Sequence, residues 1–135
     1  MPVVQCVDYG DKAGFVVLWQ GIVKVGDNFE PEVYDYEVEF DLGDDVREGC
    51  FGYLSMMTYD VDYTYNKLYI NGTYVGTLHD YDKSEWRVDT FRVPTGAVKK
   101  GKNIFKLTAR NKSGGYTGQV DDFKVQDPLL IYAVK

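Results

Sequence analysis

The sequence contains few of the residues from which metal centres and catalytic sites are usually built. Histidine occurs once, at His79, and cysteine twice, at Cys6 and Cys50, in 135 residues. A zinc site needs four ligands, often including a CxxC pair, so these three residues cannot complete one. The two cysteines either form a disulfide in an oxidising compartment or remain buried free thiols, and the sequence leaves both open.

Positive charge is also scarce. The chain has 15 Lys and Arg against 21 Asp and Glu, which gives a formal net charge of -6. Proteins that bind nucleic acid need clustered Lys and Arg to contact phosphates. The one local cluster, Lys99, Lys100 and Lys102, surrounds Gly101 and is typical of a solvated turn. The sequence therefore predicts no nucleic-acid partner.

Apolar runs are short. None approaches the length of a membrane-spanning helix, so we expect no membrane insertion. The N-terminal residues show neither a basic region nor a long apolar region of a secretory signal. The chain is expected to be either cytosolic or the mature form of an exported protein.

Aromatic residues, in contrast, are abundant: they make up 16% of the chain, and 12 of them are Tyr. Several lie in a segment that predicts a hairpin. Asn71-Gly72 separates the β-prone runs Lys67 to Ile70 and Tyr74 to Leu78. Asn-Gly between two such runs is a strong hairpin signal, because both residues tolerate positive φ.

Further short runs predict an all-β chain with no amphipathic helix. Val33 to Phe40 alternates aromatic and aliphatic residues with acids, which indicates one core face and one acidic face. Phe15 to Trp19 is continuously apolar and predicts a strand buried on both faces; Ile22 to Val25 either extends it or pairs back on it. The remaining predicted strands are Phe51–Tyr59, Arg87–Val93, Ile104–Ala109, Gln119–Val125 and Leu129–Val134. Evenly spaced short strands predict a sandwich or barrel, here a single domain over residues 1–135.

The middle of the chain resembles a known family. The quoted segments are Tyr59-Asp60-Val61-Asp62, Leu68 to Gly72, Val75 to Leu78, Trp86, Phe91 to Pro94, Gly101 to Asn103, and the Asp-rich Asp121-Asp122-Phe123. In this order they resemble the galactose-binding-like jelly-roll domains of prokaryotic secreted and surface proteins, which include carbohydrate-binding modules. The resemblance implies an antiparallel β-sandwich of jelly-roll type at an extracellular or cell-surface location. It also implies carbohydrate binding or adhesion in some members, scaffolding in others, and a structural calcium ion in many.

Acidic residues offer candidate calcium ligands. Calcium takes six to eight oxygen ligands, and the acids fall into several clusters, none with EF-hand spacing. Asp60 and Asp62 would point the same way if they lay in a strand. Our predicted metal ligands are Asp60, Asp62 and Asp122, and the alternative is a solvated acidic surface.

Aromatic and polar residues interleave in the same region. Sugars stack on exposed aromatic rings and hydrogen-bond to carboxylates and amides. The predicted sugar-binding residues are Tyr63, Tyr65, Asn66, Tyr81, Asp82 and Trp86. The alternative for the aromatic members is packing in the core or on a strand surface.

Catalysis has little support. His79 is the one candidate for a catalytic triad, and no serine has the sequence context of an activated nucleophile. We therefore predict a non-catalytic module that binds carbohydrate and that calcium stabilises. The alternative is a structural subunit that self-assembles into a surface layer, filament or virion, as a homo-oligomer. In that case the apolar segments Val3 to Val7 or Leu129 to Val134 would add as strands to a neighbour.

Overall fold

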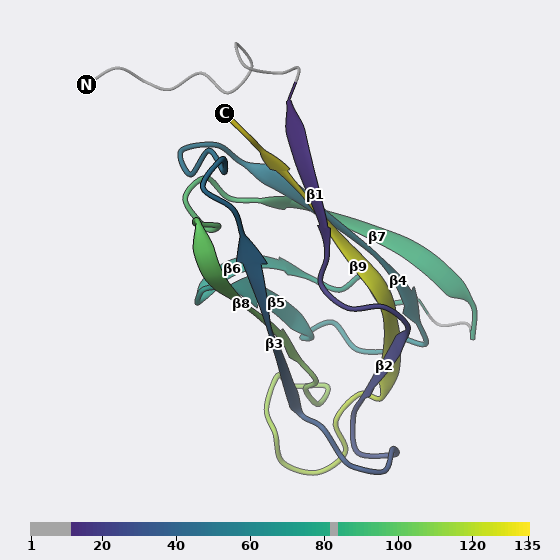
Figure 1. The fold of residues 1–135 in the computed structure, drawn as a ribbon. Helices are drawn as coiled ribbons and strands as arrows, with labels where there is room; N and C mark the ends of the chain where they lie inside the picture. Colours follow the sequence, from purple (N-terminus) through teal and green to yellow (C-terminus); the bar gives the residue numbers. More distant parts are fainter. Residues whose placement is uncertain (1–11, 82–83) are drawn as a thin grey trace.

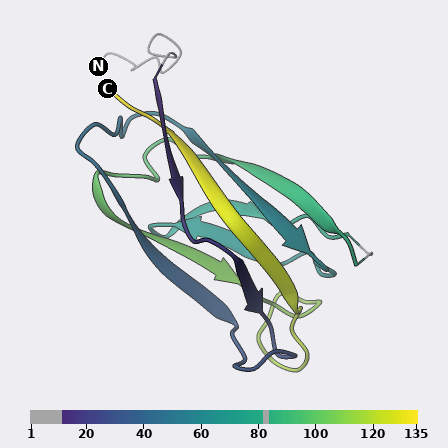
Figure 2. The same cartoon turned by 45° about the vertical axis from the view of Figure 1, so that its right-hand side comes forward.

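The computed structural model describes residues 12–81 and 84–135, which form two antiparallel sheets lying face to face (Figures 1 and 2). Four strands of the first sheet run in the order β1 (Ala13–Val17), β9 (Phe123–Ala133), β4 (Gly52–Tyr59), β7 (Trp86–Val93), and β2 (Ile22–Val25) also pairs with β9. The second sheet has the order β3 (Asp35–Leu42), β8 (Gly101–Thr108), β5 (Lys67–Ile70), β6 (Thr73–Thr77). The predicted all-β jelly-roll sandwich is confirmed.

The core lies between the two sheets and follows the alternation of the strands. Leu68 and Phe105 from one sheet and Leu54 and Leu130 from the other are fully buried. Each such side chain contributes about 1.5–3 kcal/mol when it leaves water. Within residues 12–81 and 84–135 there is no helix that is long and apolar enough to cross a bilayer.

The predicted hairpin is present and is fastened to the next strand. Asn71 and Gly72 have φ values of 51° and 79°, as a two-residue hairpin turn requires. The Asn71 side chain accepts a hydrogen bond from Ile104 N at 2.9 Å and donates to Asn103 Oδ1 at 2.8 Å. The turn residue therefore also sets how the hairpin sits against β8.

The prediction for Phe15 to Trp19 was wrong in its burial. Phe15 is 64% exposed and Val17 is 42% exposed, because β1 is an edge strand whose side chains alternate between the two faces of the sheet, and these two lie on the outer face. Ile22 to Val25 neither extends β1 nor pairs with it. Both segments pair with β9, one after the other along its length.

The two strands predicted at the end of the sequence are a single continuous strand in the structure. β9 runs from Phe123 through Ala133, and Asp127 takes a φ of 50° where the pairing register shifts. Asp127-Pro128 lies between the two predicted strands, and a β-bulge there accommodates the proline, which lacks an N–H. Gly21 N donates to Asp127 Oδ1 at 2.6 Å and so holds the bulge.

The position of β9 also corrects one route to assembly. Residues 129–133 lie inside the five-stranded sheet, paired with β1 on one side and with β4 on the other. They offer no open edge to a neighbouring chain. Val3 to Val7 lies outside the described residues.

Four loops gather at one end of the sandwich. There β4 ends next to the start of β7, and β3 begins beside the end of β8. The loops that join β2 to β3, β4 to β5, β6 to β7 and β8 to β9 therefore lie together, at the lower end in Figure 1. Most of the predicted site residues belong to this loop end.

Candidate functional site

The loop between β4 and β5 is held by a buried carboxylate from the far end of the sequence. Asp121 Oδ2 accepts hydrogen bonds from Asp62 N at 3.0 Å, from Tyr63 N at 3.0 Å and from Asn66 Nδ2 at 2.7 Å. Asp121 is 2% exposed. One side chain thus fixes the backbone that carries Tyr63 and Tyr65.

Asn66 belongs to this internal network. Its side chain is fully buried, and its Oδ1 accepts a hydrogen bond from Arg110 N at 2.9 Å while its Nδ2 donates to Asp121. Both ends of the amide are therefore committed inside the protein. Asn66, which we predicted to bind sugar, therefore fixes the position of the loop from the interior of the protein.

The environment of Asp121 is unusual for a carboxylate. Burial raises the pKa of Asp121 to about 6, although its three hydrogen bonds act in the opposite direction. Asp121 Oδ1 is buried and has no hydrogen-bond partner in the described part of the chain. Such an oxygen calls for a proton or a cation.

Tyr63 and Tyr65 lie on the surface of this loop. Lys112 Nζ from the loop between β8 and β9 stands 5.7 Å from the centre of the Tyr63 ring. The Tyr65 ring packs against Gly114, where a Cβ would come within 3.1 Å of it, and Tyr65 is 41% exposed. A shallow hollow of about 460 Å³ is lined here by Asp62, Tyr63, Thr64 and Lys112.

Tyr81 and Trp86 lie on different faces. Tyr81 N donates to Val61 O at 2.7 Å, so Tyr81 sits beside the β4–β5 loop, with the Arg87 guanidinium 4.1 Å above its ring. Trp86 begins β7 and packs on Tyr59 with the ring centres 5.2 Å apart. Asp82 lies outside the described residues. The structure thus brings Tyr63, Tyr65 and Tyr81 to the loop end and places Trp86 on the outer face of the five-stranded sheet.

The predicted metal ligands do not share a strand. β4 ends at Tyr59, and Asp60 takes a φ of 64°, so the premise that Asp60 and Asp62 point the same way was wrong. The backbone N–H of Asp62 donates a hydrogen bond to Asp121, whereas Asp122 packs against Gly26. No group of three or more His, Cys, Asp or Glu that could hold a metal occurs within residues 12–81 and 84–135.

A second concave site lies on the outer face of the four-stranded sheet, and we call it the sheet groove. It has a volume of about 500 Å³. Its floor includes a row of paired residues from three strands: Glu37 on β3 lies opposite Lys106 on β8, and Lys106 lies opposite Tyr69 on β5. Tyr74 on β6 lies opposite Tyr69, outside the lining of the groove. The Tyr69 and Tyr74 rings meet edge to face at 6.0 Å.

One end of the sheet groove is closed by a cation–aromatic pair. The Arg110 guanidinium lies 3.7 Å from the centre of the Tyr116 ring and donates to the Tyr116 hydroxyl. Arg110 Nη1 also forms an ion pair with Asp35 at 2.9 Å. Tyr116 nevertheless remains 53% exposed. Its ring is therefore fixed by Arg110 but still accessible at the border of the groove.

The sequence analysis missed the sheet groove. Its residues are the outward members of strands whose inward members were recognised as core. The alternation of Leu68, Tyr69 and Ile70 could have identified Tyr69, but which residues lie opposite it depends on strand order, which no local pattern contains.

His79 is not an isolated loop residue. Its Nδ1 lies 2.7 Å from Asp89 Oδ1, and Asp89 is an inward-facing carboxylate on β7. The imidazole stacks on Phe91 at an interplanar angle of 5°. No serine of the described segments bonds to this pair, so it holds the loop after β6 rather than forming a triad.

Comparison with known proteins bears on the fold. No protein-family model matches the sequence, and no curated protein matches it. Among solved structures, the chain is similar to the CBM36-1 domain of a multidomain xylanase from the hindgut metagenome of Trinervitermes trinervoides. The match covers 92% of this chain and 99% of that chain, with a TM-score of 0.52 and 12% sequence identity. The chain therefore has the antiparallel β-sandwich fold of a carbohydrate-binding module, as the resemblance in its sequence predicted.

Proposed function

We propose that the chain binds carbohydrate without catalysing a reaction, and that the sheet groove holds the sugar. The observation that carries the proposal is the row of Glu37, Lys106 and Tyr69 across three strands of the four-stranded sheet. It combines aromatic surface with a carboxylate and an ammonium group at one level of the sheet. Sugars are bound by this combination, in which a ring contacts the apolar face and charged groups bond to hydroxyls.

Rigidity supports the choice of this groove. Glu37, Lys106 and Tyr69 of its floor stand on strands, and the strands are fixed by fully buried neighbours such as Phe105 and Leu107. A binding surface that is already ordered loses little conformational entropy on binding. Along β8 the groove extends from Ile104 toward Arg110, a length of about 20 Å at strand geometry, which suits a short stretch of glycan chain.

The fold also supports the proposal. The similar domain is named as a carbohydrate-binding module of a xylanase, and it shares its architecture with this chain over nearly its whole length. By analogy we propose a polysaccharide as the ligand class. The analogy concerns fold, so the assignment of residues rests on the groove itself.

The loop end is the competing location. Tyr63 lines a hollow of similar volume there, and Tyr65 and Tyr81 lie in or beside the same loop. That hollow is built on loops, and Tyr65 is partly covered by Gly114. Direct comparison of the two places by mutation is therefore part of the test.

The test begins with a glycan array on the purified chain, followed by calorimetric titration of a retained glycan. Tyr69→Ala should weaken binding at least about tenfold, the usual effect of removing a central aromatic contact. Tyr53→Ala is the matched control, because Tyr53 is an exposed tyrosine on the opposite sheet. Loss of binding with Tyr63→Ala but not with Tyr69→Ala would move the site to the loop end, and retention of no glycan would overturn the proposal.

Calcium is a separate part of the proposal. Asp121 is the residue that would hold the ion, since its Oδ1 is buried without a hydrogen-bond donor. Asp27 Oδ1 is likewise buried without a hydrogen-bond donor. Asp27 Oδ2 accepts a hydrogen bond from the backbone N–H of Val120, the residue before Asp121. A hard cation would be satisfied by such carboxylate oxygens together with backbone carbonyls. Calcium should raise the melting temperature of the wild type and leave that of Asp121→Asn unchanged; equal responses would contradict the assignment.

We also propose that the protein works outside the cytoplasm. Cys50 is buried and disulfide-bonded, and disulfides persist mainly in oxidising compartments. Cys6 lies outside the described residues. Quantifying free thiols in protein isolated from its native source under alkylating conditions would test this location.

A further inference from the structure

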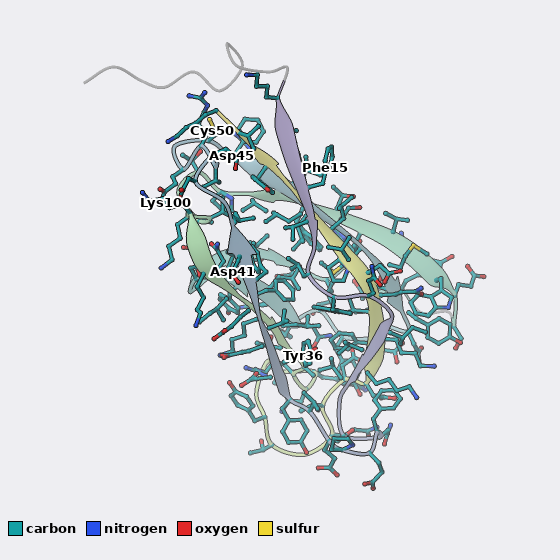
Figure 3. The ribbon with its side chains drawn as sticks, in the orientation of Figure 1. Phe15, Tyr36, Asp41, Asp45, Cys50 and Lys100 are labelled. Carbon is teal, nitrogen blue, oxygen red and sulfur yellow. The ribbon has the colours of Figure 1, made fainter. Side chains whose placement is uncertain are left out.

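We infer that the sheet groove selects an extended glycan chain over a single sugar, with Tyr116 as a second stacking platform and Arg110 as the residue that positions it. The inference rests on the proposed sugar site and names the class of ligand that this site prefers. Two tyrosines, Tyr69 and Tyr116, line the groove. β3 lies beside β8 along the groove, and Figure 3 labels Asp41 near the end of β3 and Tyr36 near its start, which is at the loop end.

The two tyrosines belong to different levels of the sheet. Tyr69 lies opposite Lys106 on β8, and Arg110, which supports the second ring, follows Lys106 by four residues. Ala109 N donates to Tyr34 O at 2.8 Å, so the pairing of this segment continues beyond the end of β8. Four residues of paired strand span about 13 Å. One sugar ring is smaller than this span, so only a chain of sugars contacts both levels.

Arg110 is held firmly enough to hold a ring in turn. It is 8% exposed, and its guanidinium donates to Ala109 O at 2.9 Å and to Tyr34 O at 3.3 Å. An ion pair with Asp35 at 2.9 Å also fixes the guanidinium. Its plane covers the Tyr116 ring at 3.7 Å from the ring centre, a stacking contact that suits the flat guanidinium. Because Tyr116 remains more than half exposed, ring surface is left for a sugar.

The loop that carries Tyr116 is fixed on both sides of this residue. Asn111 Oδ1 accepts a hydrogen bond from Gly115 N at 2.9 Å, and Asn111 Nδ2 donates to Thr117 O at 2.8 Å. Asn111 thus holds the backbone of the loop, while Arg110 holds the ring. A platform that is ordered before the ligand arrives loses little conformational entropy on binding.

Calorimetric titration with ligands of two lengths tests the inference. The probes are the disaccharides and hexasaccharides of cellulose, xylan and mannan. Tyr116→Ala should raise the dissociation constant of a hexasaccharide at least about tenfold and that of the matching disaccharide less than about twofold. The shorter ligand is expected to be held at Tyr69, beside Glu37 and Lys106, so Tyr69→Ala should weaken both. A change in overall stability alone would not discriminate between ligand lengths.

The role of Arg110 is tested by a conservative substitution. Arg110→Lys keeps a positive charge beside Asp35 but has no planar group to cover the ring. It should reproduce the length-selective loss of Tyr116→Ala, and combining the two substitutions should cause no further loss, since both remove the same platform. Arg92→Lys is the matched control, because Arg92 lies 4.3 Å from the centre of the Phe51 ring, outside the groove. It should leave both affinities unchanged.

A measurement without sugar separates this inference from the proposed function. The ring-proton resonances of Tyr116 should move toward those of a free tyrosine in Arg110→Lys, and circular dichroism should show the variant folded. If Arg110→Lys loses its fold, Tyr116→Ala still tests the platform, because Tyr116 is exposed.

Three results would overturn the inference: unchanged Tyr116 resonances in folded Arg110→Lys, a loss in Tyr116→Ala that is equal for both ligand lengths, or binding of none of the probes. The proposed function would survive each of them as long as the glycan array retains a ligand that Tyr69→Ala weakens.

Discussion

Asn66 and Asp121 are 55 residues apart in the sequence and form a fully buried hydrogen bond of 2.7 Å between their side chains. The bond joins the loop after β4 to the segment that leads into β9. The two residues also satisfy backbone N–H groups of Asp62, Tyr63 and Arg110. This pair therefore determines the shape of the loop end, and the predictions begin with it.

Asn66→Ala should lower the free energy of unfolding by about 2–3 kcal/mol. The substitution leaves Arg110 N without its acceptor and removes one of three donors from a buried carboxylate. Urea denaturation monitored by tryptophan fluorescence measures the loss. Asn28→Ala, at an exposed position, should change stability by less than about 0.5 kcal/mol. Equal effects of the two substitutions would show that the network contributes nothing.

Stability should fall as the pH rises from about 4 to 6 when a chelator is present. The pKa of Asp121 is about 6 in the folded chain and 3.8 in the unfolded chain, so the folded state holds the extra proton within this window. A state that binds more protons is weakened when protons are withdrawn, and the upper bound of the change is about 3 kcal/mol.

Asp121→Asn should remove this part of the pH dependence. Unfolding free energies of the wild type and the variant, measured at several pH values between 4 and 7, give the difference directly. A difference that stays constant across the range would contradict the raised pKa. Calcium bound at the carboxylate would lower that pKa, so the wild-type slope should also flatten when the ion replaces the chelator.

Gly76→Ala should destabilise the protein by about 1–3 kcal/mol through overpacking. A Cβ at residue 76 would lie 2.4 Å from Cδ1 of Phe91, whose ring is in the core. Thermal unfolding measures the effect, and Phe91→Leu in the same chain should restore part of the loss. Gly49→Ala is the control, because nothing lies within 4 Å of the added methyl group. Equal melting temperatures of the two alanine variants would show that the close approach of residue 76 to Phe91 does not affect stability.

Asp89 should select the tautomer of His79 that carries its proton on Nδ1. Asp89 is buried and its Oδ1 lies 2.7 Å from that nitrogen, while its Oδ2 accepts a hydrogen bond from His79 N at 3.2 Å. Nitrogen chemical shifts of the neutral imidazole report the tautomer. In Asp89→Ala the shifts should move toward those of a free histidine, and unchanged shifts would show that Asp89 has no such role.

Local patterns in the sequence predicted most of the fold. Asn71-Gly72 identified a hairpin because its turn chemistry requires no distant information. The acids of residues 35–41 identified the exposed side of β3, because in a strand with one buried face the alternation of apolar and acidic residues fixes which side chains face solvent. The errors have different causes. Phe15 and Val17 resemble core residues, and only the strand order reveals that β1 lies at an edge with its outer side in solvent.

The candidate site was predictable only in part. Tyr63, Tyr65 and Tyr81 meet at the loop end, and their loop positions were readable from neighbouring turn residues. Asn66 resembled a sugar ligand because its side chain is polar, but its partner Asp121 is distant in sequence, so its burial was not visible. The sheet groove depends on which strands are neighbours, and this cannot be read from a local pattern.

The pairing of β9 has a consequence for synthesis of the protein. β1, β2 and β4 all pair with β9, which follows all of them in the sequence. A nascent chain that has not yet reached residue 123 lacks the template of its larger sheet. β4 can already pair with β7, but β1 and β2 pair with no other strand in the described part of the chain and must wait unpaired on the ribosome; long-range pairing of this kind is slow. The growing polypeptide is therefore expected to depend on chaperones until β9 emerges.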